Sequence, residues 1–173
     1  MTTLKTIILI FILLLVGAAY YIHSGSYNIA AKVPHNQLSE WVLHNIKEYS
    51  IRNHAKDIKR PKLGDETQVE EGFEHYNNTC SGCHGTPGTD PAKGFNPSPP
   101  KLVDASEEMS AEELFWVTKN GIKMTAMPAI SEDHNDEDIW SIVAFLKRLP
   151  DITPEEYEAM IETTSVNNDD HSH

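Results

Sequence analysis

The stretch Cys80-Ser-Gly-Cys83-His84 holds both cysteines of the 173-residue chain, two residues apart, with a histidine directly after the second. Two thiols and an imidazole this close in sequence must also lie close in space, whatever the fold. If these three side chains hold a metal or a cofactor, the rest of the chain has to fold around it. A Cys-x-x-Cys-His pattern fits a zinc site, a thiol redox pair, a surface disulfide or a covalently attached haem.

Two of these groups fit the rest of the sequence poorly. A zinc site needs about four ligands, usually including a second Cys or His pair, and no second cysteine pair exists here. A thioredoxin-like site is expected in a βαβ setting, which the sequence does not show, and a Cys80–Cys83 disulfide is the simplest remaining alternative. Covalent haem explains all three residues, since the two thiols add to the haem vinyl groups and the histidine binds the iron. We therefore expect one covalent haem c, held by Cys80 and Cys83, with His84 as its first axial ligand.

A sixth ligand would complete the coordination of such an iron, and a methionine thioether is the usual partner in electron carriers. The segment GIKMTAMPAI is loop sequence, from which a side chain can reach across a pocket, and Pro128 fixes the backbone directly after Met127. Met127 is the predicted ligand, with Met124 as the second choice and Met109 as the third candidate. A displaced sixth ligand would instead indicate a haem enzyme or a gas sensor.

Helical signals dominate the sequence. Apolar residues recur at helical spacing, and Ser110 with Glu113 forms a capping box. Gly121 and Pro150 follow two of the expected helices, and the proline-containing segment 85–109 is expected to be loop. The pattern predicts an all-α fold with helices at 39–59, capped by Ser39, at 66–79, at 111–120 and at 136–150.

The N-terminus is uncharged from Ile7 to Ile22, with Lys5 before it. This length is close to that of a membrane span, for which about 17–25 residues are needed. We interpret residues 1–24 as a single-pass membrane anchor, with a cleaved signal peptide as the alternative. In either case the positive-inside rule places the rest of the chain on the periplasmic or extracytoplasmic side.

Charge is unevenly distributed along the chain. Residues 1–60 hold seven Lys and Arg against three Asp and Glu, whereas residues 61–173 hold seven against twenty-three. An acidic globular part argues against a nucleic-acid surface. It fits docking to a basic patch on another protein, although acidity also serves solubility alone. Besides the anchor, we predict a linker and a basic amphipathic helix at 25–61, the main domain at 62–150 and an acidic, partly disordered tail at 151–173.

From about Glu66 to Leu149 the chain resembles the class I c-type cytochromes. The resemblance lies in the segments GFEHYNNTCSGCHG, PSPPKL, FWVTKNGIKMTAMPA and IWSIVAFLKRLP. It implies a cytochrome c fold in which the helix before the cysteines crosses the C-terminal helix, so that Gly72 and Tyr76 pack against Trp140 and Phe145. It also implies that the Pro100 carbonyl accepts a hydrogen bond from the axial histidine and that Leu102 lines the haem pocket.

More narrowly, the chain is similar to the membrane-anchored single-haem cytochromes that accompany dehydrogenases or terminal oxidases in bacterial respiratory chains. This similarity implies an electron carrier that is not itself an enzyme. Its partners would be a dehydrogenase, an oxidase or a quinol-oxidising complex, or it would be an obligate subunit of one of them. The helix at 39–59 lies outside the family core. Its histidines, His44 and His54, with His35 before it, raise the hypothesis of a second haem, against which we favour a helix that docks to a membrane surface or a partner subunit.

Overall fold

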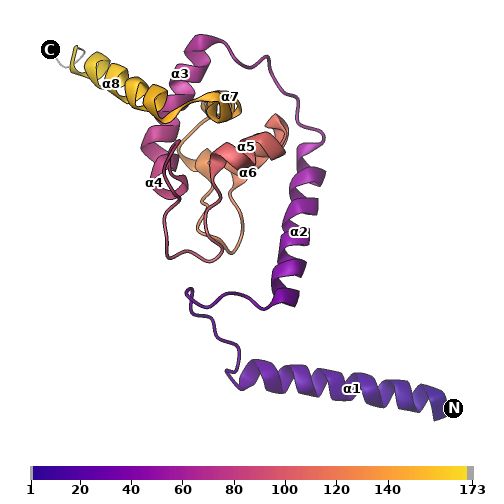
Figure 1. Cartoon of the computed structure of the whole chain (residues 1–173). Helices are drawn as coiled ribbons and strands as arrows, with labels where there is room; N and C mark the ends of the chain where they lie inside the picture. Colours follow the sequence, from indigo (N-terminus) through magenta and orange to yellow (C-terminus); the bar gives the residue numbers. More distant parts are fainter. Residues whose placement is uncertain (1, 171–173) are drawn as a thin grey trace. The chain divides into compact units, whose positions relative to one another are not determined.

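The computed structural model describes residues 2–170, which fold into helices and loops without a strand. The all-α prediction is confirmed. The chain divides into two compact units, residues 1–33 and residues 34–173 (Figure 1).

The first unit is built on helix α1 (Thr2–His23). Its segment Thr3–His23 has a mean hydropathy of 2.3, and none of it is buried. By length and composition α1 can cross a membrane, and a signal sequence near an N-terminus would meet the same criteria.

The second unit contains the remaining helices, several of them short. In chain order they are α2 (Gln37–Ala55), α3 (Glu66–His75), the π-helical turn η1 (Tyr76–Cys80), α4 (Ser81–His84), α5 (Leu102–Glu108), α6 (Ala111–Asn120), the 3₁₀ turn η2 (Ile130–Glu132), α7 (Asp136–Arg148), the 3₁₀ turn η3 (Leu149–Asp151) and α8 (Pro154–Asp170).

The core of this unit is the crossing of α3 over α7. Gly72 lies where the two backbones meet, because a Cβ added to it would stand 1.9 Å from the carbonyl oxygen of Ser141. About one turn after Gly72, the ring of Tyr76 packs against Phe145 of α7, with the ring centroids 5.1 Å apart. The expected glycine contact between these helices is thus present, whereas Trp140 stacks on Phe115 of α6 at 4.2 Å.

Helix α7 is buried along most of its length, from Ile139 to Leu146. A capping box starts the helix: the Asn135 side chain accepts a hydrogen bond from the Asp138 backbone, and the Asp138 carboxylate accepts one from the Asn135 backbone. Ser110 and Glu113 form the same arrangement at the start of α6, as predicted, and Gly121 ends α6 with a φ of +66°.

Helix α2 begins two residues earlier than predicted and ends earlier too. Asn36, not Ser39, is its N-cap, since the Asn36 side chain accepts a hydrogen bond from the Ser39 backbone at 2.9 Å. The helix packs against α6 through its C-terminal half, where Ile51 and Ala55 are buried.

Helices also form within the segment predicted to be loop and within the segment predicted to be a partly disordered tail. Residues 102–108 form α5, because Leu102 and Val103 pack against the core and so stabilise a turn that local sequence alone does not favour. The segment predicted as a partly disordered tail contains α8, anchored by the buried ring of Tyr157. The part of that prediction that concerns residues 171–173 lies outside the described residues.

Candidate functional site

The two cysteines lie at the end of a helical segment that changes pitch just before them. The backbone of Ser81 donates to Tyr76, which makes η1 a π turn that follows α3 directly. Such turns insert one extra residue into a helix and often occur at functional sites. The turn delivers Cys80, partly buried against the core, and Cys83, exposed on the short helix α4.

His84 is the last residue of α4, and the loop that follows fixes its ring. Its Nδ1 lies 2.9 Å from the carbonyl oxygen of Pro100, sixteen residues further along the chain. A carbonyl can only accept a hydrogen bond, so Nδ1 carries the proton and Nε2 of the neutral ring keeps its lone pair. The hydrogen bond that the resemblance implies is therefore present, and it leaves one nitrogen able to bind a metal.

The loop between α4 and α5 is held by contacts at both of its ends. The Tyr76 hydroxyl donates to the carbonyl of Gly85 at 2.6 Å, and the backbone of Ala92 donates to the carbonyl of Cys83 at 2.9 Å. Near its far end, Lys101 forms an ion pair with Asp90 at 2.8 Å. These contacts keep the Pro100 carbonyl beside the His84 ring.

A cavity of about 270 Å³ opens beside this loop. His84 and Leu102 both line it, together with Tyr76 and Val103. Leu102 thus lies at a pocket wall with His84. Cys80, Cys83 and Met127 are not among the residues that line this cavity.

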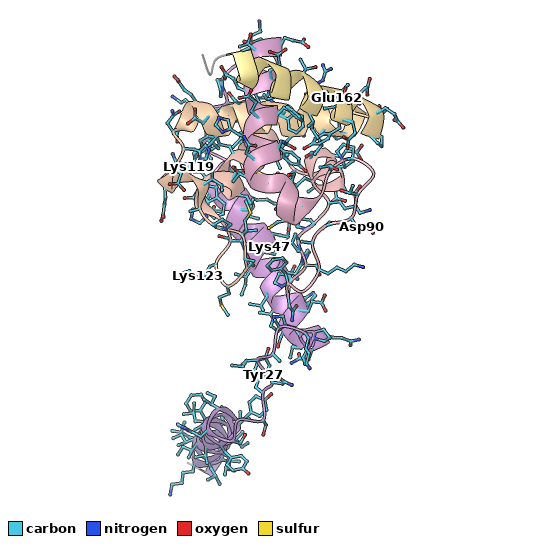
Figure 2. All side chains as sticks on the ribbon, turned by 90° about the vertical axis from the view of Figure 1, so that its left-hand side faces the viewer. Tyr27, Lys47, Asp90, Lys119, Lys123 and Glu162 are labelled. Carbon is cyan, nitrogen blue, oxygen red and sulfur yellow. The ribbon has the colours of Figure 1, made fainter. Side chains whose placement is uncertain are left out.

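The second loop, residues 121–135, carries the candidate sulfur ligands. In Figures 1 and 2 it extends from the same end of the second unit as the loop that follows His84. Its backbone turns back on itself, because Ile122 donates to the carbonyl of Met127 at 3.2 Å. Gly121 permits this turn, since a Cβ there would stand 2.7 Å from that same carbonyl oxygen.

The two methionines of this loop differ in their surroundings. Met127 is partly buried, and its backbone donates to the Thr125 hydroxyl at 3.1 Å. Met124 is 82% exposed and has a positive φ of +62°, so its side chain points into solvent. Burial thus distinguishes Met127, the predicted ligand, from Met124.

The thiol of Cys80 is poorly suited to thiol chemistry or zinc binding. Both cysteines are free in the structure. Burial, with a smaller contribution from the neighbouring Cys83, raises the pKa of Cys80 to about 12. Zinc binding and disulfide exchange both require a thiolate, which this environment disfavours. Within residues 2–170, moreover, no group of three or more His, Cys, Asp or Glu side chains is arranged to hold a metal ion.

The donor set fits a haem c. Two free thiols lie next in sequence to an imidazole whose Nδ1 is held by a carbonyl and whose Nε2 is free to bind a metal, and the loop at 121–135 carries a partly buried thioether, that of Met127. Residues 67–146, slightly under half of the chain, match the family model described as cytochrome C oxidase, cbb3-type, subunit III. These residues form a c-type cytochrome domain. No curated protein matches the chain.

A cytochrome domain of this kind binds haem c and transfers electrons. The domain carries one further contact that sequence reasoning did not find. Tyr157 of α8 donates a hydrogen bond to the side chain of Asn77, three residues before Cys80, at 3.1 Å. Helix α8 therefore buttresses the turn that presents the cysteines. The sequence offered only an aromatic residue within an acidic segment as a sign of it.

Proposed function

We propose that this chain is a mono-haem c-type cytochrome that carries single electrons between respiratory proteins. Cys80 and Cys83 would bind one haem through thioether bonds, and His84 and Met127 would be its two axial ligands. When bound, the haem supplies an iron that cycles between the ferric and ferrous states. With both axial positions filled, the chain would offer no coordination site to a substrate, so it would act as a carrier and not as an enzyme.

The observation that carries this proposal is the hydrogen bond from His84 Nδ1 to the Pro100 carbonyl. A carbonyl in this place fixes the tautomer and the ring orientation of a metal-bound histidine and raises its basicity. The loop that contributes this carbonyl is itself held by hydrogen bonds and an ion pair near both of its ends. Such a rigid acceptor fits a histidine whose orientation matters for binding a metal.

We further propose that α1 remains in the mature protein as a single-pass anchor. The haem domain would then lie on the periplasmic or extracytoplasmic side, where covalent attachment of haem takes place. The anchor would confine diffusion to the plane of the membrane. Electrons would enter and leave through transient contacts with redox proteins, and the acidic composition of residues 61–173 would favour partners with a basic patch.

The first experiment is a pyridine haemochrome spectrum with iron stoichiometry on the full-length chain purified in detergent. One haem c per chain is expected. An additional haem b would show that His35, His44 or His54 binds a cofactor, and the absence of haem would overturn the proposal.

Axial ligation is tested separately, with Met127→Ala and Met124→Ala as a matched pair in the same loop. Replacement of Met127 should lower the reduction potential and create an open iron site that binds carbon monoxide, because a thioether stabilises the reduced iron. Met124→Ala should leave spectrum and potential unchanged. The opposite pattern would show that Met124 is the ligand.

A second candidate is an obligate cytochrome subunit of an oxidase or dehydrogenase complex. The family description names a subunit of an oxidase, and the cytochrome domain is joined to a helix, α2, that lies outside the residues matched by the family model. Purification in mild detergent decides between the two. A stable complex with other chains would favour the subunit, and an isolated chain would favour the mobile carrier.

A further inference from the structure

Helix α2 has a row of large apolar side chains on the side that does not face the cytochrome domain. Five residues form this row, which we call the α2 stripe. Their exposed fractions are 71% for Leu38, 64% for Trp41, 37% for Val42, 60% for Ile46 and 68% for Tyr49. A contiguous apolar surface of this kind on a soluble unit marks an interaction site.

The stripe is not the surface that attaches α2 to the rest of the unit. Helix α2 contacts α6 through Ile51 and Ala55, which are 5% and 3% exposed. Ile51 follows Val42 by nine residues, which is about 180° around an α-helix. Ile51 likewise lies about 160° from Tyr49, whereas Ala55 lies about 40° from Trp41, near the other end of the helix. The Ile51 side of α2 is therefore occupied by the cytochrome domain, while the middle of the stripe faces away from it and is exposed.

We propose that the α2 stripe lies in the lipid–water interface of the membrane that α1 spans. This inference rests on the anchoring of α1, which belongs to the proposed function, and does not depend on how the haem is ligated.

Chain length brings α2 close to a lipid surface. Only residues 24–36 separate the last residue of α1 from the first residue of α2. Thirteen residues span at most about 45 Å when fully extended. If α1 crosses the bilayer, α2 is held near its surface at a high effective concentration, so a modest apolar face is sufficient for binding.

The composition of the stripe fits an interface better than a protein core. Trp41 and Tyr49 lie on it about two turns apart, and both residue types are enriched at the level of lipid headgroups because each has an apolar ring with one polar group. Helices that lie in this plane combine such a face with polar and basic residues elsewhere on their surface.

Charge favours the same orientation. Residues 25–61 hold six Lys and Arg against three Asp and Glu, whereas residues 62–173 hold seven against twenty-three. Anionic headgroups attract the first segment and repel the second. Lys59 and Lys62 are exposed in the segment that follows α2. With the stripe on the bilayer, the acidic cytochrome domain would be carried on the opposite face of α2 and directed toward its partners.

The test is spin-label accessibility in the full-length haem-loaded chain, reconstituted in nanodiscs that contain an anionic lipid. Ile46→Cys places the label on the stripe. His44→Cys is the matched control, since it is exposed and lies about 160° away around the same helix, two residues earlier. Both sites are at the surface, so neither substitution is expected to impair folding, and the chain without an added cysteine reports background labelling.

At position 46 the label should be several-fold more accessible to oxygen than to an aqueous nickel chelate, and at position 44 the order should be reversed. Equal chelate access at both positions would overturn the inference. Line broadening at position 46 that disappears on dilution with unlabelled chain would also overturn it, since a second copy would then cover the stripe.

A measurement without an introduced cysteine makes the result independent of the label. Brominated lipids in the same discs should quench the fluorescence of Trp41. The tryptophan emission of the wild type should therefore fall when brominated lipid is present, and this fall should be lost in Trp41→Phe. Undiminished quenching in the variant would contradict the inference. Co-elution with the disc reports the anchor, and the haem spectrum reports the cofactor. A result in which the stripe remains exposed to water can therefore be distinguished from loss of the membrane anchor and from loss of the haem.

Discussion

Helices α2 and α7 both carry a row of large apolar side chains, but they use it differently. On α7, residues 139 to 146 are all buried against α3, α5 and α6. On α2 the apolar row is exposed, and only the opposite side near the C-terminal end of the helix is buried. Sequence periodicity finds both rows and does not tell which of them has a partner within the chain.

The two rows therefore have different roles: one stabilises the fold, and the other is available for contact with something outside the chain. The α7 row provides the packing on which the cytochrome domain depends, and it crosses the helix that leads directly to the cysteines. The α2 row contributes little to that packing, because its side chains are exposed. An apolar surface that stabilises nothing within the chain is best explained by contact with something outside it.

The largest expected effect compares two isoleucines, one in each row. Ile142 on α7 is 0% exposed, whereas Ile46 on α2 is 60% exposed. Ile142→Ala should lower the free energy of unfolding by about 3–4 kcal/mol, because it removes buried methyl groups and leaves a cavity. Ile46→Ala should change it by less than about 0.5 kcal/mol. Urea unfolding of the holoprotein measures both.

If Ile142→Ala is too unstable to purify, Ile142→Val serves instead, with an expected loss of about 1 kcal/mol. Equal losses at positions 46 and 142 would show that the stripe is packed within the chain, and the contrast between the two helices would be wrong.

The next effect concerns the point where α3 and α7 touch. Gly72→Ala should destabilise the domain by about 3 kcal/mol, since the new Cβ would overlap the backbone of Ser141 and Phe145 would have to move as well. Glu70→Ala, exposed on the same helix, is the control and should be almost neutral. A Gly72→Ala protein as stable as the control would mean that the two helices can separate at no cost.

Much of the fold could be predicted because its signals are local. The capping box at Ser110, the glycine after α6 and the strongly amphipathic α7 each depend on residues within a few positions of one another. The hydrogen bond from His84 to Pro100 spans sixteen residues. It was expected only through the resemblance to c-type cytochromes.

What could not be predicted depends on tertiary contacts. Helix α5 lies in a segment with loop-like composition and forms because Leu102 and Val103 reach the core. Helix α8 has an acidic sequence without a strong pattern, and the buried ring of Tyr157 attaches it, with Met160 and Ile161 partly buried beside it. The exposure of the α2 row is likewise invisible in sequence, since a helical period is the same whether the apolar face is covered or open.

Tyr157 provides a smaller test that extends the comparison to α8. Tyr157→Phe removes the hydrogen bond to Asn77 and keeps the ring, so it should lower the free energy of unfolding by about 1 kcal/mol near neutral pH. Burial raises the pKa of Tyr157 to about 12 from its ordinary value of 10.0.

The sign of the resulting pH dependence follows from that shift. The folded state holds the phenol proton more tightly than the unfolded state, so this contribution to stability is fully present below about pH 10 and is lost as the pH rises toward 12. Unfolding measured at pH 9 and pH 12 should show a smaller alkaline loss in Tyr157→Phe than in the wild type. An equal alkaline loss of stability in the wild type and in Tyr157→Phe would show that Tyr157 has the same pKa in the folded and unfolded states.

The smallest effect concerns two ion pairs with α6, one made by Arg52 of α2 and one made by Arg60 in the segment that follows α2. Arg52 lies 3.9 Å from Glu113 and Arg60 lies 3.6 Å from Glu112, with both arginine side chains more than half exposed. Each pair in water should contribute no more than about 0.5 kcal/mol. Arg52→Gln with Arg60→Gln should therefore leave the unfolding of the core unchanged and remove most of the salt dependence of α2 attachment, observed as hydrogen exchange of the α2 amides.

Ile51→Ala is the matched variant at the same contact, since it removes buried apolar area and keeps both arginines. It should speed exchange in α2 at every salt concentration, whereas the double arginine variant should do so only at low salt. If instead the arginine variant detached α2 completely, charge and not burial would hold the helix to the domain. The face opposite the α2 stripe would then be an electrostatic contact that anionic lipids could compete for, and α2 would be expected to leave the domain when it binds the membrane.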